Sequence, residues 1–273
     1  PEASAEARQA MIARLGLDLP VWQQYGNFLW RALHGDLGNS FVHGIPAISL
    51  ILQRIPATFE LVLVAIVLTC TIGIPLGLVA GLHRDRPLGR GIMATSVLGF
   101  SLPNFWQGMM LILLFSVWLG WLPVQGYVSI TDDIWLAAQH LVLPTLALAI
   151  FYMSLISRET RASVLEVLNE DFVRTAKAKG VPPLRILSQH VLRNAAIPIV
   201  TVIGIGLAFL ISGVVITESV FNLPGLGRLT IDAVLSRDYP VVQGVILFFA
   251  CVYILVNLLI DMLYVVIDPR IRY

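Results

Sequence analysis

The stretch "LVLVAIVLTCTIGIPLGLVAGL", residues 61–82, is uncharged from end to end. A bilayer core of ~30 Å is crossed by about 20 apolar residues in a helix. Gly73, Gly77 and Gly81 recur every four residues, which places them on one helix face and lets another helix approach closely. The stretch therefore predicts a membrane-spanning helix that packs tightly against a neighbouring helix.

Four further apolar runs have the length of a span. Residues 91–131 lack Asp, Glu, Lys and Arg and predict a helix near 93–120, and the other runs are 134–157, 194–217 and 241–266. The mean hydropathy of +0.82 and the 13% of charged residues agree with a membrane protein and argue against a large soluble helical core. The predicted fold class is an all-α, polytopic transmembrane helix bundle with five spans in this chain. Cys70 and Cys251 lie singly in such runs and are expected to act as small apolar side chains.

The positive residues orient this bundle. If the five spans are threaded in order, most of the 18 Lys and Arg residues fall on one side, which the positive-inside rule makes cytoplasmic. Pro1 is then outside without a signal-like stretch, so we expect a sixth span before it. The expected division is an extracytoplasmic segment with short amphipathic helices at 1–55, a transmembrane domain at 56–267 that includes a cytoplasmic loop at about 160–193, and a cytoplasmic tail at 268–273.

Ionisable residues are scarce inside the spans. Glu60, Glu218 and Asp261 are placed near span ends, where interfacial water solvates a carboxylate. This weakens the alternative of an ion-coupled secondary transporter or channel that acts alone. The chain has no His-Glu-x-x-His, no nucleophile elbow and no Gly-x-x-x-x-Gly-Lys-Ser/Thr phosphate loop, and its formal charge of +1 gives no basis for nucleic-acid binding. We expect no catalytic residue, cofactor site or metal site in this chain.

One cytoplasmic segment, "VRTAKAKGVPPLRILSQHVLRNAAIPIV" at residues 173–200, is unusually cationic. Gly180 is predicted to end a first helix, and Pro183 to open a second one. Each helix has a predicted apolar face, made by Leu165, Leu168, Phe172 and Ala176 in the first and by Leu184, Leu187 and Val191 in the second. A solvated loop that is basic only because it is cytoplasmic would not need such regular faces. The segment is therefore predicted to be a docking surface for a cytoplasmic partner.

The same segment resembles the signature loop of the membrane subunits of binding-protein-dependent ATP-binding-cassette importers. Their signature is Glu-Ala-Ala, three residues, Gly, nine residues and Ile-x-Leu-Pro; aligned on Gly180, only Ala176 and Leu192 match. The departures are similar to the peptide-transporting branch, in "EDFVRTAKAKG" (170–180) and "HVLRNAAIPIVTVIG" (190–204). Three other stretches resemble the B-type permease of dipeptide and oligopeptide importers: "HGDLGNS" (34–40), "TESVFNLPGLGRLTIDAVLSRDYPVVQG" (217–244) and "LLIDMLYVVIDPRIR" (258–272).

This resemblance implies a type I importer architecture with six spans in the full protein, in the cytoplasmic (inner) membrane of a bacterium. It implies a C-type permease as partner, two ATPase subunits that hold ATP and Mg, an extracytoplasmic substrate-binding protein, and surrounding membrane lipid. The loop would couple the ATPases to transport. The residues carried over to that role are Glu170, Asp171, Arg174, Ala176, Lys177, Gly180, Leu184, Arg185, Leu187 and Leu192.

The loop between the last two spans is the second candidate site. Asn222, Pro224, Gly225 and Gly227 form a turn cluster, and with Arg237 and Asp238 they are predicted to contact the binding protein. A plain surface loop is the alternative. The function implied is ATP-driven import of dipeptides or longer peptides, with glutathione and nickel left open as substrates. A transporter or channel acting alone, and an assembly factor without transport activity, are the rival functions.

Overall fold

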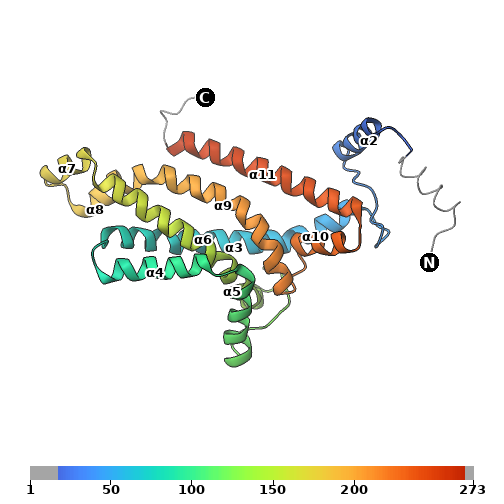
Figure 1. Cartoon of the computed structure of the whole chain (residues 1–273), viewed down its shortest axis with the longest axis horizontal. Helices are drawn as coiled ribbons and strands as arrows, with labels where there is room; N and C mark the ends of the chain where they lie inside the picture. Colours follow the sequence, from blue (N-terminus) through green and yellow to red (C-terminus); the bar gives the residue numbers. More distant parts are fainter. Residues whose placement is uncertain (1–17, 268–273) are drawn as a thin grey trace.

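The computed structural model describes residues 18–267, except the side chains of residues 208, 209, 211, 212 and 265–267. Helices run between the two ends of an elongated bundle (Figure 1). The long helices are α3 (Ala47–Leu82), α6 (Ile134–Leu168), α9 (Leu192–Val220) and α11 (Tyr239–Ile267). At one end lie α7 (Asp171–Ala178) and α8 (Pro183–Arg185), and at the other α2 (Val21–Leu33) and α10 (Leu226–Leu235). The predictions for 1–17 and 268–273 lie outside the described residues.

The glycines of α3 face α6 at very short range. A Cβ atom on Gly77 would lie 2.5 Å from the carbonyl oxygen of Ser157 and 2.6 Å from Cβ of Thr160. Gly73 and Gly81 approach the same helix, and Ser157 Oγ donates to the carbonyl oxygen of Gly73 at 3.0 Å. Any larger side chain at these positions would push the two central helices apart.

Helix α3 begins earlier than the sequence predicts. The predicted span began at residue 61, but the helix starts at Ala47 and continues through Pro56 and Pro75 for 36 residues. At 1.5 Å per residue its length is about 54 Å, well beyond a bilayer core of ~30 Å. The extra turns are covered by α10 and α11, so Ala47, Leu50 and Ile51 are buried in a core with these two helices.

The predicted helix near 93–120 is broken. α4 (Pro87–Ser101) ends before Pro103, and the segment made by α5 (Asn104–Leu111) and the π-helix η1 (Ile112–Trp118) leaves it at an angle of 105°. Figure 1 shows this segment leaving the bundle almost at a right angle. The run near 93–120 therefore holds a bent pair of helices rather than one continuous helix, because Pro103 removes a backbone donor and restricts the residue before it.

Three clusters of buried side chains follow the long axis. We call the end that carries α10 the outer end and the end that carries α7 the inner end, after the predicted orientation. The outer cluster joins α3, α10 and α11, and the central cluster joins α3, α6 and α9. The inner cluster joins α6, α7, η2 (Ile186–Val191) and α9, and it comprises Val164, Val173, Ala176, Ile186, Val191, Ala195 and Ile199. The end that carries α7 and α8 therefore shares a buried core with the long helices α6 and α9.

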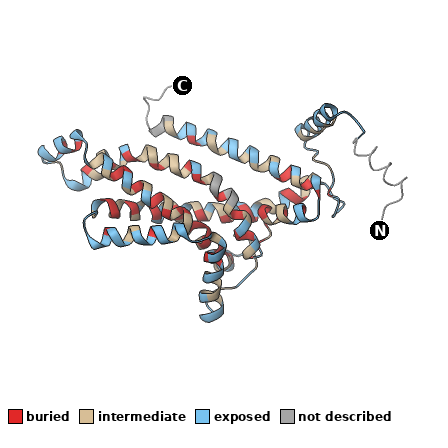
Figure 2. Ribbon diagram, viewed as in Figure 1, coloured by how far each residue is buried: buried red, intermediate tan, exposed pale blue. Residues whose placement is uncertain are grey.

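Four helices among the described residues are long and apolar enough to cross a membrane, or five if the bent pair α4–α5 counts as one span. α11 is one of them, although few of its residues are buried within the chain, and Figure 2 shows pale blue and tan along most of it. An apolar helix that is exposed in the isolated chain suits contact with lipid or with another membrane subunit.

Candidate functional site

Gly180 makes the sharp turn at the inner end of the bundle. Its φ is +75°, a conformation that glycine adopts without steric cost. The amide of Gly180 donates to the carbonyl oxygen of Lys177, and the amide of Val181 donates to that of Ala176. This pair of bonds is the Schellman arrangement, which satisfies the last carbonyls of α7. The turn is therefore rigidly defined, and the chain re-enters a helix at Pro183, as the sequence predicts.

The predicted apolar faces around Gly180 are corrected by the structure. α6 ends at Leu168 and α7 starts at Asp171, so the first stripe does not lie on one helix. In α7 the buried residues are Val173 and Ala176, whereas the predicted Phe172 is 42% exposed.

The second stripe changes because residues 186–191 form a π-helix. Its bonds join residues five apart, so Ile186 and Val191 share the buried face. Leu184, which 3.6-residue periodicity placed on the buried face, is instead 77% exposed.

Leu184 forms an exposed apolar tip on α8, between Pro183 and Arg185. Arg185 Nε donates to Gln189 Oε1 at 3.0 Å. On α7 the Arg174 and Asp171 side chains form an exposed ion pair at 3.3 Å. An exposed leucine on a rigid, anchored turn is suited to bind a cleft in a partner protein. We name residues 170–192 the coupling element, after the role that the sequence predicts for them.

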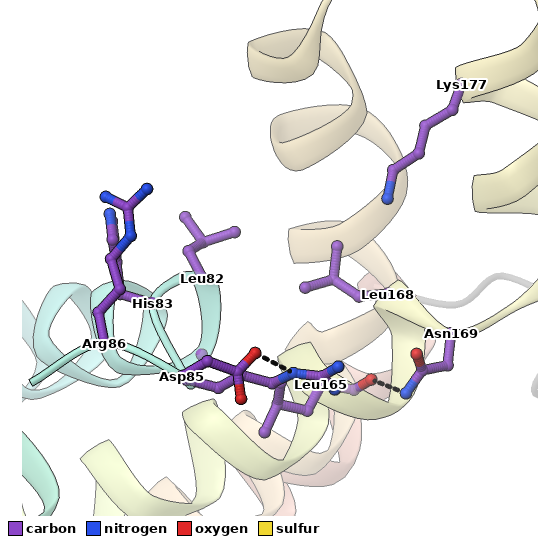
Figure 3. Close-up of a pocket in the computed structure, with 10 residues that line it drawn as sticks. Leu82, His83, Asp85, Arg86, Leu165, Leu168, Asn169 and Lys177 are labelled. Atoms are coloured by element: carbon purple, nitrogen blue, oxygen red, sulfur yellow. Dashed lines mark hydrogen bonds and ion pairs between the residues drawn. The ribbon is translucent and has the colours of Figure 1, made fainter. Parts of the chain in front are cut away.

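A pocket of about 280 Å³ lies beside the coupling element. The turn between α3 and α4 contributes His83, Arg84 and Arg86, and α7 contributes Lys177, whose side chain reaches toward the pocket in Figure 3. Arg84 is paired with Asp85 at 3.2 Å. The surface next to the coupling element is therefore rich in cationic side chains, as expected of a cytoplasmic membrane face.

At the opposite end Glu218 contradicts its predicted environment. The sequence placed it in interfacial water, but the side chain is 0% exposed. Thr58 Oγ1 donates to its Oε1 at 2.6 Å, and the amide of Arg228 donates to its Oε2 at 3.0 Å. The amide of Leu226 in turn donates to Thr58 Oγ1 at 2.8 Å. Glu218 thus supplies the acceptors that the first turn of α10 needs, and it ties α9 and α10 to α3.

Of the six residues predicted to contact a binding protein, three are buried and three are accessible. Gly225 and Gly227 are buried, and a Cβ on Gly225 would overlap the Glu218 carboxyl group. Asp238 is 2% exposed and accepts bonds from Ser40 Oγ and from the amide of Phe41, so it holds the loop before α3. Three of the six remain accessible to varying degrees: Asn222, Pro224 and Arg237.

Residues 73–273 match the family described as "Binding-protein-dependent transport system inner membrane component". The chain belongs to this family. Among residues 18–267 no group of three or more His, Cys, Asp or Glu side chains is placed to hold a metal ion.

Two curated relatives resemble this permease over nearly its whole length. The dipeptide transport system permease protein DppB of Escherichia coli (strain K12) is 43% identical over 293 residues, which cover 99% of this chain and 86% of the relative. A Brucella abortus (strain 2308) protein named as a peptide transport system permease is 43% identical over 271 residues, with the same coverage of 99% and 86%.

Solved structures support the fold of the permease. The MetNI methionine ABC transporter in inward-facing conformations matches with a TM-score of 0.68 at 18% identity, over 81% of this chain and 97% of that one. An amino acid ABC transporter crystallised with histidines matches with a TM-score of 0.52 at 18% identity, over 82% and 94% of the two chains. The all-helical, membrane-spanning architecture of an ABC importer permease, which the resemblance implied, is therefore confirmed.

Proposed function

We propose that this permease imports dipeptides or short oligopeptides across the inner membrane of a bacterium, as one half of a heterodimer with a related C-type permease. The printed names of its relatives, which concern peptide and dipeptide transport, support the substrate class. Two cytoplasmic ATPases would supply the energy from ATP and Mg, because the chain lacks the phosphate-binding loop that would let it do so.

The observation that carries this proposal is the exposed Leu184 on an element anchored in the inner core. Val173 and Ala176 of α7 and Ile186 of η2 are buried in one cluster with residues of α6 and α9. Because packed cores resist deformation, a displacement of the tip would move α6 and α9 with it. The coupling element therefore has the mechanical continuity needed to convert closure of two ATPases into movement of membrane helices.

At the outer end Asn222, Pro224 and Arg237 are the proposed contacts for a substrate-binding protein. Arg237 is exposed at the tight turn between α10 and α11, where its φ is +56°. Leu235 and Tyr239 on either side of it are 78% and 60% exposed. A mixed apolar and cationic surface held on short, bonded turns is suited to a transient protein contact.

Leu184→Asp in the complete importer, reconstituted in proteoliposomes with its binding protein, tests the docking role. A charge in a desolvated contact is expected to lower dipeptide uptake about tenfold or more, and the ATPase subunits should dissociate more readily during purification. Leu33→Asp is the matched control, because Leu33 is an exposed leucine (74%) in α2, at the end of the molecule opposite the coupling element (Figure 1).

Normal uptake by the Leu184→Asp complex would overturn the docking assignment. A wild-type chain that purifies as a stable homo-oligomer, with no second permease and no ATPase, would overturn the importer function itself.

A further inference from the structure

The cationic pocket beside the coupling element lies at the level where a membrane span ends. The uncharged stretch of α3 stops at Leu82, which lines the pocket together with Gly81 and the turn that follows. A Cβ on Gly81 would lie 3.0 Å from Val164 Cγ1, so the last turns of α6, which supply Leu165 and Leu168 to the pocket wall, lie beside the end of α3. A span reaches the layer of lipid headgroups where its apolar residues stop. The pocket is therefore at headgroup depth, on the side that the positive-inside rule makes cytoplasmic.

Three basic side chains from two distant segments line this pocket. Arg84 and Arg86 belong to the turn between α3 and α4, and Lys177 belongs to the last turn of α7. All three residues are exposed, so a molecule that enters the pocket can reach their side chains. Figure 3 shows Arg86 and Lys177 on opposite sides of the pocket, with leucine side chains between them.

The chain leaves much of this positive charge without a partner. Asp85 is the one carboxylate among the described residues that line the pocket, and it pairs with Arg84 at 3.2 Å. The side chains of Arg86 and Lys177 form no hydrogen bond or ion pair with any residue that the structure describes. Two cations that border one space repel each other, and an anion between them replaces that repulsion with attraction. The pocket therefore favours a negatively charged occupant.

Exposed apolar side chains continue from the pocket along α4. Arg86 is the residue before this helix, and Leu88, Val97 and Leu98 of the helix are exposed, as is Leu82 in the pocket itself. Figure 2 shows pale blue along much of α4. A molecule with an anionic head and apolar tails matches this sequence of a cationic and then an apolar surface. A free phosphate ion would use only the first of the two.

We propose that the pocket binds the headgroup of an anionic phospholipid, with its phosphodiester group between Arg86 and Lys177 and its acyl chains along α4. The guanidinium fork of arginine and the ammonium group of lysine both bind phosphate oxygens. Basic pockets between membrane helices on the cytoplasmic side bind such headgroups in other membrane proteins. A volume of about 280 Å³ is close to the lower limit of ~300 Å³ for small-molecule sites, which suits a headgroup rather than a whole lipid.

A lipid bound here would join two separate parts of the inner end. Lys177 belongs to the coupling element, whereas Arg86 belongs to the turn between two membrane helices. One phosphate group in contact with both would hold the coupling element against that turn. The inference goes beyond the proposed function and does not depend on which substrate the importer carries.

Native mass spectrometry of the complete importer tests the proposal. The purified, delipidated complex is titrated in detergent with dioleoylphosphatidylglycerol, and the bound lipids are counted. In the double variant Arg86→Gln and Lys177→Gln we expect the affinity of one lipid site to fall about tenfold or more, because both phosphate-binding charges are lost. The matched control is Arg90→Gln with Lys179→Gln. It removes the same charge from the same two segments at exposed residues that do not line the pocket, and it should bind the lipid like the wild type.

Two further ligands separate the possible sources of the phosphate group. Dioleoylphosphatidylcholine carries the same acyl chains on a zwitterionic head, and inorganic phosphate carries the anion without acyl chains. We expect the site to retain phosphatidylglycerol in preference to phosphatidylcholine, and inorganic phosphate not to displace it. Equal retention of the two lipids, or displacement by inorganic phosphate, would overturn the assignment to an anionic lipid.

A crosslink to the wild-type importer keeps the inference testable if the double variant fails to assemble. Phosphatidylglycerol with a diazirine group is photolysed in the presence of the complex, and the labelled residues are identified. Labels at 81–98 or 165–177 support the site, whereas labels confined to other segments overturn it. An unchanged lipid affinity in the assembled double variant also overturns it. An importer that is labelled at these segments but takes up no peptide supports the lipid site and overturns the proposed function alone.

Discussion

The two ends of this permease differ in how far their charged side chains are exposed. At the inner end Asp171 and Arg174 form a pair whose side chains are 94% and 70% exposed. At the outer end Glu218 and Asp238 are buried, and each accepts bonds from segments far away in the sequence. Exposed charges can exchange partners at little cost, whereas buried ones fix the geometry around them. The inner end therefore leaves its charged side chains accessible, and the outer end uses its own to hold its helices together.

Replacing Glu218 with alanine should break the outer end and have the largest effect. The change leaves Thr58 Oγ1 and the amide of Arg228 without their acceptor and opens a cavity beside Gly225. We expect a loss of about 3 kcal/mol in stability, measured as a lower midpoint of thermal unfolding of the purified complex. Glu218→Gln is the control, because it retains one acceptor oxygen and nearly the same volume, and it should lose less. An unchanged midpoint in the alanine variant would show that the network does not hold α10.

Gly180→Ala tests whether the inner end depends on its turn geometry. A Cβ at residue 180 meets nothing within 4 Å, so the change acts only through the φ of +75°, at a cost of about 1 kcal/mol. The complex should assemble normally, but the tip should lose its fixed direction, and uptake per ATP hydrolysed should fall severalfold. Gly180→Asn is the matched variant, since asparagine adopts this conformation more readily than alanine and should retain more coupling. Equal coupling ratios in all three proteins would argue against a role for the turn.

Features that depend on one helix alone can be predicted from the sequence, whereas contacts between distant segments cannot. The apolar runs and Gly77 predict spans and close packing correctly, because both depend on composition and spacing within one helix. The burial of Glu218 is not visible in this way, since a carboxylate near the end of a span looks solvated until α10 folds over it. Gly225 and Gly227 were recognised as a turn, and what they approach became clear only from the contact with Glu218.

At the inner end the turn can be predicted from the sequence, but the exposure of the side chains beside it cannot. Gly180 and Pro183 mark the turn because their backbone preferences are local. The exposure of Leu184 is missed, because a 3.6-residue period does not apply where η2 has π-helical bonds. The sharpness of the break at Pro103 does not follow from the proline alone, since four other prolines, Pro56, Pro75, Pro144 and Pro198, lie within continuous helices. At the break Gln107 Nε2 donates to the carbonyl oxygens of Gly99 and Leu102 at 2.8 and 2.9 Å, a pair of contacts that the sequence does not reveal.

The smallest effect is expected from Asp171→Asn, and comparing it with Asp238→Asn sharpens the difference between the ends. Both substitutions replace a carboxylate with an amide of the same shape. At Asp171 the lost partner is one solvated guanidinium, so the unfolding midpoint should not change measurably. At Asp238, which is 2% exposed, one acceptor for Ser40 or Phe41 becomes a donor facing a donor, and the midpoint should fall. If Asp171→Asn instead reduced uptake while the midpoint stayed constant, the pair would have to be part of the contact with the ATPase rather than a solvated surface pair. Equal midpoints for the two variants would contradict the division between an accessible inner end and a self-bonded outer end.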